Sequence, residues 1–251
     1  MNSNYRRKEI YEIIRQQGAT PVVALTERFG VSAMTIRRDL DILEDQQLIV
    51  RSYGKALPRE KRMIENNYQQ RNVMHMEAKR SIAHKALALL QDVDSIYVDN
   101  STTCNALIEL LPENLSMTVY TNSVPALNLL FQKPGINTFV FGGSLSHSAQ
   151  SLDSTSSLVA VKDIYVDAAF ISCCGYNETK ICNNDIVSIN ERRVMLTNAN
   201  RRYLLADSSK QHEKGLFTIC SWDMIDVFVT EMFPDSKIYS AILQNGVEII
   251  A

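Results

Sequence analysis

The feature that most constrains the fold of this 251-residue chain is the alternation of strand-like and helix-like segments from residue 77 onwards. Short apolar runs alternate with stretches in which apolar residues recur every three or four positions. This alternation is typical of a mostly parallel sheet covered by helices on both faces, so residues 77–251 are predicted to form one α/β domain. We expect strands at 95–99, 117–121, 137–141, 167–172, 203–206 and 226–230, and helices at 77–91, 103–111, 123–132, 152–164 and 186–200.

Polar residues and glycines follow five of these predicted strands. In parallel sheets ligands bind beyond the carboxyl ends of the strands. Each loop alone is more often a helix cap or a turn, but five at one sheet edge predict a pocket. Hydroxyl groups, backbone N–H groups and one lysine suit a small phosphorylated, polyhydroxylated molecule. The loops are Asp99-Asn100-Ser101-Thr102-Thr103, Thr121-Asn122-Ser123, Gly142-Gly143-Ser144, Cys173-Cys174-Gly175 and Asp207-Ser208-Ser209-Lys210.

Residues 1–57 are predicted to form a separate domain of three short helices and a hairpin. A first helix is expected over Arg6–Gln17. Thr20 can cap the second, with Pro21 at its first helical position and Gly30 at its end. Ser32 is the expected N-cap of the third helix.

The third helix carries two distinct faces. Ile36, Leu40 and Leu43 recur at core spacing, which turns Met34 and Arg38 outward and puts Thr35 and Arg37 on the flanks. Two helices joined by a glycine-containing turn predict a helix-turn-helix, whose second helix enters the major groove of DNA. An apolar strand at 48–50, a turn at Gly54 and a return strand predict a wing. The DNA-binding candidates are Ser32, Met34, Thr35, Arg37, Arg38, Arg51, Tyr53 and Lys55.

The charge distribution supports this division of roles. Residues 1–62 hold 12 Lys/Arg and 8 Asp/Glu, whereas residues 63–251 hold 14 and 20. A basic head on an acidic body indicates that only the head meets a polyanion, although chance surface charge could produce the same excess. Residues 58–76, which are polar and lack glycine, are interpreted as a partly helical linker between the two domains.

Several classes of protein are not favoured by the sequence. No apolar run is long enough for a membrane helix and the N-terminus has no apolar signal segment, so we expect a cytoplasmic protein that does not bind membranes. The five cysteines form no Cys-x-x-Cys pair and fit no zinc-ligand spacing, so neither disulfides nor a metal site is predicted. No cofactor is expected.

The head resembles the winged helix of the DeoR family of bacterial transcriptional regulators. The resemblance rests on Val31-Ser32, Thr35-Ile36-Arg37-Arg38-Asp39-Leu40, Leu43-Glu44, Arg51, Tyr53-Gly54 and Ala56. Lys55 departs from it, because the family usually has a second glycine there.

The body resembles the DeoR-family sensor domain, which is similar in fold to ribose-5-phosphate isomerase and glucosamine-6-phosphate deaminase and typically senses a sugar phosphate. Ser101, Ser144 and Cys174 depart from the family's usual glycine, glutamate and aspartate. A ligand that differs from the family's commonest effectors, or that binds weakly, is one implication. The effector-binding candidates are Asp99, Ser101, Thr102, Thr103, Asn122, Ser123, Gly142, Gly143, Gly175, Glu191 and Lys210.

The sequence is compatible with three functions. The first is a sequence-specific DNA-binding regulator, a repressor of a carbohydrate operon, that binds operator DNA as a homodimer or homotetramer and responds to a phosphorylated sugar or polyol. The second is a sugar-phosphate isomerase or deaminase with a DNA-binding head, for which Glu191 is the candidate base; a solvent-facing or ion-paired Glu191 is the alternative. The third is a general DNA-compacting protein, which the acidic body disfavours.

Overall fold

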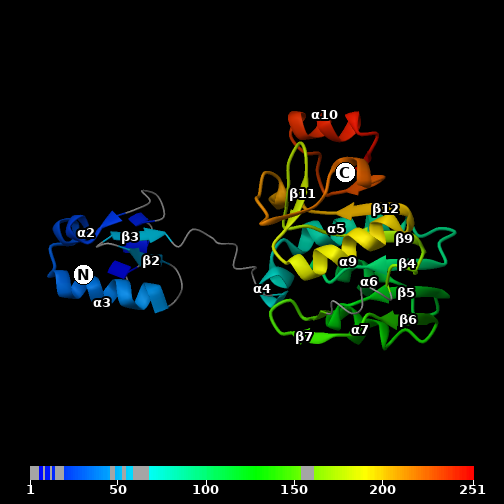
Figure 1. Ribbon diagram of the computed structural model, residues 1–251, viewed down its shortest axis with the longest axis horizontal. Helices are drawn as coiled ribbons and strands as arrows, with labels where there is room; N and C mark the ends of the chain where they lie inside the picture. Colours follow the sequence, from blue (N-terminus) through cyan, green and yellow to red (C-terminus); the bar gives the residue numbers. More distant parts are fainter. Residues whose placement is uncertain are drawn as a thin grey trace. The chain divides into compact units, whose positions relative to one another are not determined.

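The computed structural model describes residues 6–7, 9–11, 13–14, 20–45, 49–52, 55–58, 68–153 and 161–251. The chain divides into two compact units, residues 1–64 and 65–251. Figure 1 traces the elements of each unit. Among the described residues, no helix combines the length and the apolar character that crossing a bilayer requires.

The first unit is a winged helix-turn-helix, as the sequence predicts. Helical residues at 6–7, 9–11 and 13–14 precede two further helices and a small antiparallel sheet in the strand order β1-β3-β2. β2 and β3 form the wing, and β1 adds a third strand that the sequence analysis did not foresee. The elements are β1 (Thr20–Pro21), α2 (Val22–Phe29), α3 (Ala33–Asp45), β2 (Ile49–Ser52) and β3 (Lys55–Pro58).

Local chemistry fixes the ends of these helices. Gly30 ends α2 in the left-handed region, with φ 61°, a conformation that glycine adopts without steric cost. Ser32 caps α3, because its Oγ accepts the N–H of Thr35 at 3.2 Å. The expected capping role of Thr20 is wrong. Thr20 lies in β1 opposite Ala56, so pairing with the wing replaces a helix cap at this position.

The second unit is built on a seven-stranded parallel sheet, which confirms the predicted α/β class. Its strand order is β15-β14-β12-β9-β4-β5-β6. The chain enters at β4, adds β5 and β6 on one side, and then returns to add β9 on the other side. The winding therefore reverses between β4 and β9. The strands are β4 (Ser95–Val98), β5 (Met117–Thr121), β6 (Ile136–Val140), β9 (Val166–Ile171), β12 (Ala199–Leu205), β14 (Val227–Val229) and β15 (Glu248–Ile250).

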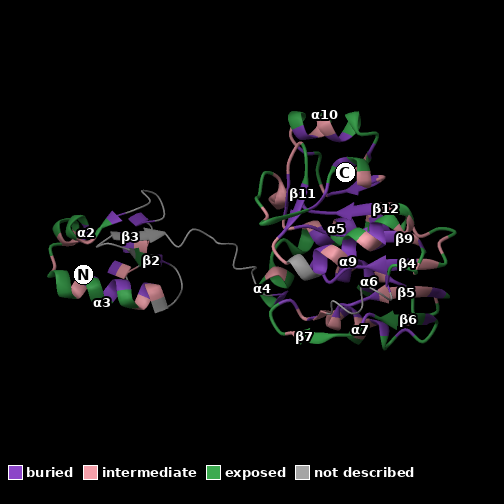
Figure 2. Cartoon of the chain, viewed as in Figure 1, coloured by how far each residue is buried: buried purple, intermediate pink, exposed green. Residues whose placement is uncertain are grey.

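Helices cover both faces of this sheet, and each face has its own apolar core. Ile82 of α5, Leu107 of α6 and Ala126 of α7 belong to one core. Ile189 of α9 and Ile238 of α10 belong to the other. Figure 2 shows the buried residues concentrated along the strands and the inner helix faces. The helices are α4 (Tyr68–Val73), α5 (Met76–Leu87), α6 (Thr102–Leu110), α7 (Val124–Leu130), α9 (Ile186–Thr197) and α10 (Ser236–Gln244), with short 3-10 helices η1 (Ser208–Lys210) and η2 (Trp222–Met224).

Some expectations for this unit need correction. The predicted helix at 152–164 begins instead as a strand, which pairs with a strand that follows the two glycines after β6; residues 154–160 of that prediction lie outside the described residues. The strand expected at 203–206 begins earlier, and the helix expected at 186–200 ends before it. A second small antiparallel sheet and β15 were not predicted. The additional strands are β7 (Ser144–Ser146), β8 (Ser151–Asp153), β10 (Gly175–Tyr176), β11 (Ile181–Asn183) and β13 (Phe217–Cys220).

The end of the predicted linker packs on the second unit. Tyr68, at the start of α4, is 6% exposed, and its Oη accepts a hydrogen bond from Asn105 Nδ2 of α6 at 2.9 Å. Its N–H also donates to the carbonyl of Ser148. Residues 59–67 of the linker lie outside the described residues.

Candidate functional site

The outer face of α3 presents the predicted DNA-contacting residues to solvent. Met34, Arg37 and Arg38 are exposed, and Met34 has 60% of its surface accessible. The hydroxyls of Ser32 and Thr35 lie 2.9 Å apart at the exposed start of the helix. The structure therefore brings these five candidates together on one helix end, opposite the buried stripe.

Arg51, Tyr53 and Lys55 are the candidates in the wing, and Arg51 is held by ion pairs within the domain. The Arg51 guanidinium forms ion pairs with Asp41 at 2.6 Å and with Glu44 at 2.7 Å. These contacts join β2 to α3, so Arg51 has a structural role that the sequence analysis did not assign. Tyr53 and the side chain of Lys55 lie outside the described residues, and their predicted roles stay predictions.

In the second unit, a pocket lies beyond the carboxyl ends of β4 and β9, where the winding of the sheet reverses. Such reversal points are where ligands bind in open α/β sheets. Residues from the β4–α6 loop, the end of β9, α9, η1 and the α4–α5 segment surround it. Its lining residues are Arg71, Met74, His75, Lys79, Ser101, Thr102, Thr103, Ser172, Cys173, Cys174, Asn183, Arg192 and Lys210.

The hydroxyl-bearing residues Ser101, Thr102 and Thr103 form the floor of this pocket at the start of α6. Ser101 is the N-cap, and its Oγ accepts the N–H of Cys104 at 3.1 Å. The N–H groups of Thr102 and Thr103 precede the first intrahelical hydrogen bond, which the N–H of Asn105 makes. In the described part of the chain, neither of these two N–H groups has an acceptor. A helix start with free N–H groups favours an anion.

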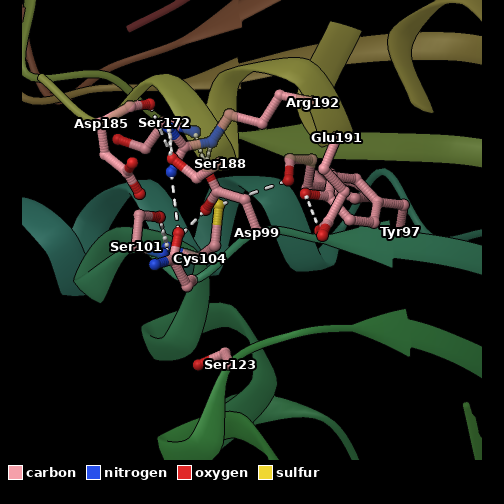
Figure 3. Close-up of polar contacts among 12 residues, drawn as sticks. Tyr97, Asp99, Ser101, Cys104, Ser123, Ser172, Asp185, Ser188, Glu191 and Arg192 are labelled. Carbon is pink, nitrogen blue, oxygen red and sulfur yellow. Dashed lines mark hydrogen bonds and ion pairs between the residues drawn. The ribbon is translucent and has the colours of Figure 1, made fainter. Parts of the chain in front are cut away.

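The carboxylate of Asp99 holds the loop between β4 and α6 in place. Its carboxylate accepts the N–H groups of Ser101 and Ser172, each at 2.9 Å, and pairs with Arg192 Nε at 2.8 Å (Figure 3). Arg192 also donates to Asn100 Oδ1 at 2.9 Å. Asp99 is fully buried and does not line the pocket. It therefore ties the β4 loop to β9 and α9, and positions the residues that do line it.

Cationic side chains make up much of the pocket wall. Lys79 is buried, and its ammonium donates to the carbonyls of Met74, at 2.7 Å, and Arg71. Burial lowers the pKa of Lys79 to about 8. Lys210 of η1 and His75 also line the pocket. None of the described lining residues is acidic, so the pocket is electropositive and suits an anionic ligand.

Other predicted effector-binding residues lie outside this pocket. Ser123 caps α7 and exchanges hydrogen bonds with Asn105, and Figure 3 shows it well apart from Asp99. Asn122 is buried beside it, and Gly142 and Gly143 are exposed beyond β6. Gly175 is buried in β10, where a side chain would collide with the Glu213 carbonyl.

Glu191 of α9 is buried against Tyr97 of β4. Only 4% of its surface is exposed, and Tyr97 Oη donates to its carboxylate at 2.9 Å. The solvent-facing alternative is therefore wrong. Burial raises the pKa of Glu191 to about 7. Because Glu191 does not line the pocket, it is not placed to act as a base on a ligand there.

Comparison with known proteins identifies the family. The family profile described as the DeoR-like helix-turn-helix domain matches residues 6–62, and the profile described as the DeoR C terminal sensor domain matches residues 74–232. The chain belongs to the DeoR family. The resemblance found in the sequence is thereby confirmed, and this DeoR-family protein is a DNA-binding regulator of transcription.

Individual relatives agree with this assignment. The L-fucose operon activator of Haemophilus influenzae is 31% identical, over 93% of this chain and 94% of the relative. The glycerol-3-phosphate regulon repressor of Escherichia coli K12 is 24% identical, over 99% of each chain. Both are named as regulators, one as an activator and the other as a repressor. Among solved structures, ribose 5-phosphate isomerase A of Methanocaldococcus jannaschii matches with a TM-score of 0.40 and 22% identity, over 55% of this chain and 56% of the isomerase.

Part of the pocket of this DeoR-family protein was not foreseen from its sequence. Residues of the α4–α5 segment were interpreted as a polar linker and the start of a helix, and Arg192 of α9 was not a candidate. A partial signal exists in the spacing Arg71, His75, Lys79, which repeats every four residues. Cys173 and Cys174 belong to one of the five predicted loops but were not among the effector-binding candidates. The other pocket residues that were not predicted are Arg71, Met74, His75, Lys79, Ser172, Asn183 and Arg192.

Replacing Glu191 by glutamine is expected to flatten the pH dependence of stability. A folded pKa of about 7 lies above the unfolded value, so the free energy of unfolding falls as pH rises from the unfolded pKa through 7. Glutamine still accepts from Tyr97 and does not ionise. Above pH 7, Glu191→Gln should therefore be more stable than wild type by up to about 3 kcal/mol. Urea unfolding at pH 5 and pH 8 measures this.

The exposed Glu113 provides the matched control. Glu113→Gln should retain the wild-type difference in stability between the two pH values. An unchanged difference in Glu191→Gln would show that Glu191 is ionised without cost in the folded protein.

Proposed function

We propose that this DeoR-family regulator binds a phosphorylated sugar or polyol in the pocket between β4 and β9, and that binding changes its affinity for operator DNA. The effector must bind the two functional states of the protein with different affinities, because only that difference can shift the equilibrium between them. One observation supports this proposal most directly. The N–H groups at the start of α6 and the cationic side chains of the pocket lie together at the point where the winding of the sheet reverses.

The chemistry of the pocket supports a phosphate group. The N–H groups of Thr102 and Thr103 offer two donors, and the hydroxyls of Ser101 to Thr103 stand beside them. Lys79 and Lys210 supply positive charge. Ser172 and Asn183 add a hydroxyl and an amide, which suit the hydroxyl groups of a sugar or polyol. Phosphate would occupy the α6 end and the hydroxylated carbons would extend toward β9 and β11.

The relatives support the breadth of this ligand class. One is named for an L-fucose operon and another for a glycerol-3-phosphate regulon, so sugars and polyols both occur in their names. We propose a repressor of a carbohydrate-utilisation operon that acts in the cytoplasm as a homodimer or homotetramer. A helix-turn-helix protein with two heads reads two half-sites, which is why an oligomer is expected.

The test is a thermal-shift screen of the full chain against hexose, pentose and polyol phosphates, with the unphosphorylated sugars as controls. A ligand at one hundred times its dissociation constant stabilises the folded state by about 2.7 kcal/mol. We expect stabilisation by a phosphorylated compound and none by its unphosphorylated counterpart. The absence of any stabilisation across all phosphates would contradict the proposed effector class. Turnover of a sugar phosphate by the purified protein would contradict the assignment as a pure sensor.

Lys210→Met is expected to weaken the effector found in that screen by roughly tenfold or more, because a hydrogen-bonded charge contributes about 1.5–3 kcal/mol. Isothermal titration calorimetry measures this loss. Lys237, which is exposed on α10 and outside the pocket, gives the matched control Lys237→Met with unchanged affinity. Equal affinity in wild type and Lys210→Met would remove Lys210 from the site.

A further inference from the structure

The two edges of the seven-stranded sheet are built differently. β15 carries Glu248, whose carboxylate lies 3.9 Å from the Arg201 guanidinium. β6, at the opposite edge, has the sequence INTFV, and no charged residue occurs from Ile136 to Ser146. Edge strands of monomeric proteins are ordinarily protected by charges, prolines, bulges or a covering segment. β6 contains no charge and no proline, and its register against β5 is regular throughout.

Among the described residues, the outer backbone of β6 is available for pairing from Thr138 onwards, whereas the N–H of Ile136 already donates to the carbonyl of Lys133 at 3.0 Å. Phe141, just after the strand, donates its N–H to Thr121 of β5 at 3.0 Å. Successive residues of a strand point their backbone N–H and C=O groups to opposite sides. The backbone groups of Phe139 therefore also point toward β5, whereas those of Thr138 and Val140 point away from the sheet. Within the described part of the chain, β6 pairs with β5 alone. A row of outward N–H and C=O groups is a template for another strand.

Ile136 is buried, but the last two side chains of β6 are exposed, one on each face of the sheet. Phe139 is 49% exposed and stacks on Tyr120 at a ring-centroid distance of 5.1 Å. Val140, on the opposite face, is 42% exposed. Figure 2 shows exposed residues along β6 at this edge. An added strand would cover apolar surface on both faces at once, which a loop or a helix lying on one face would not do.

We propose that β6 of one copy pairs antiparallel with β6 of a second copy, about a twofold axis near Thr138. The pairing places Thr138 opposite itself and Ile136 opposite Val140 of the partner copy. A twofold interface brings each residue close to its own copy, so a charge-free strand is self-complementary where a charged one would repel. The assignment rests on the proposed oligomer with two DNA-binding heads.

Closure of the assembly favours a second copy over an open chain of copies. Antiparallel pairing about a twofold axis uses both β6 edges and leaves only the two β15 edges free. Those edges carry Glu248 beside Arg201, so the joined sheet ends in protected strands. If β6 paired with a strand of an unrelated protein, there would be no reason for its edge to be complementary to itself.

The test measures the mass of the full chain in solution across a concentration series, by sedimentation velocity and light scattering. Thr138→Pro removes an outward N–H and spares the hydrogen bonds to β5. Val140→Lys puts a positive charge at the pairing surface of each copy. Both variants are expected to raise the dissociation constant of the dimer at least tenfold, or to halve the mass of a tetramer. Tyr165, a 75% exposed aromatic residue outside β6, gives the control Tyr165→Lys, which should keep the wild-type mass.

The outcomes separate this proposal from the proposed function. Circular dichroism shows whether Thr138→Pro has folded; if it has not, Val140→Lys decides. A wild-type mass in both folded variants would overturn the β6 interface and place the contact elsewhere. A monomeric wild type at micromolar concentration would also overturn it. In either case the thermal-shift response to sugar phosphates still tests the effector pocket on its own.

Discussion

Asp99→Ala is expected to lower the free energy of unfolding by about 3–5 kcal/mol, because it removes one partner of a buried ion pair. Arg192 is 3% exposed, so its guanidinium would lose a compensating carboxylate at 2.8 Å without gaining access to water. The N–H groups of Ser101 and Ser172 would lose their acceptor as well. Urea denaturation followed by circular dichroism measures the loss.

Two further variants make this expectation specific. The exposed Asp163 gives the control Asp163→Ala, which should change stability by less than about 0.5 kcal/mol. Arg192→Met in the Asp99→Ala background should recover part of the loss, because removing both charges leaves no unbalanced buried ion. If the double variant were less stable than Asp99→Ala alone, the contacts of Arg192 with its other partners would outweigh its pairing with Asp99.

The sheet was predictable because its strands and helices carry regular patterns. Runs such as Ser95–Val98 and Met117–Thr121 are long enough to show strand character, and the helices between them repeat their apolar residues. The strands that were not predicted have two to four residues. A segment of that length is too short to show the two-residue alternation of apolar and polar side chains that marks a strand. Ser151–Asp153 became a strand through tertiary contacts: Ser151 bridges to Ser123, and Leu152 donates to the carbonyl of Asn122.

The hydroxyl floor of the pocket was predictable, but its extent along the sheet edge was not. Polar loops follow several parallel strands, and all of these ends meet at one edge of the sheet. Strand order then decides which loops are neighbours. β9 lies next to β4, so Ser172 joins Ser101, whereas β6 lies two strands away and leaves Gly142 outside. Strand order depends on how the whole chain winds, and no local pattern contains it.

The basic residues of the pocket wall could not be placed there from the sequence. Lys79 was part of a predicted helix, and Arg71 and His75 were part of a predicted linker. A polar segment between domains looks the same whether it is solvated or packed. The burial of Tyr68 against Asn105 is what brings α4 to the pocket, and that contact joins residues 37 positions apart. The same is true of Glu191: its pairing with Tyr97 spans 94 positions, so its burial was not visible in the sequence.

Arg38→Ala is expected to weaken operator binding by roughly tenfold for each recognition helix, and by about a hundredfold for two heads, because one arginine contact to a base contributes about 1–3 kcal/mol. Arg38 is exposed on the face of α3 opposite its buried stripe, so its replacement should remove the predicted DNA contact and leave the core intact. Fluorescence anisotropy with a fragment of its own promoter, at one stated salt concentration, measures the affinity. Arg201→Ala, in the second unit, makes the same charge change and should bind as wild type does.

The way in which affinity falls identifies what Arg38 contacts. An arginine that forks onto a guanine edge lowers specific binding while random DNA binds nearly as before, so the specificity ratio falls. An arginine that neutralises a phosphate weakens both equally and lowers the salt dependence by about one counterion for each head. Effector-induced thermal stabilisation should stay unchanged in Arg38→Ala in either case. Wild-type affinity for the promoter fragment would show that another face of the first unit reads the DNA.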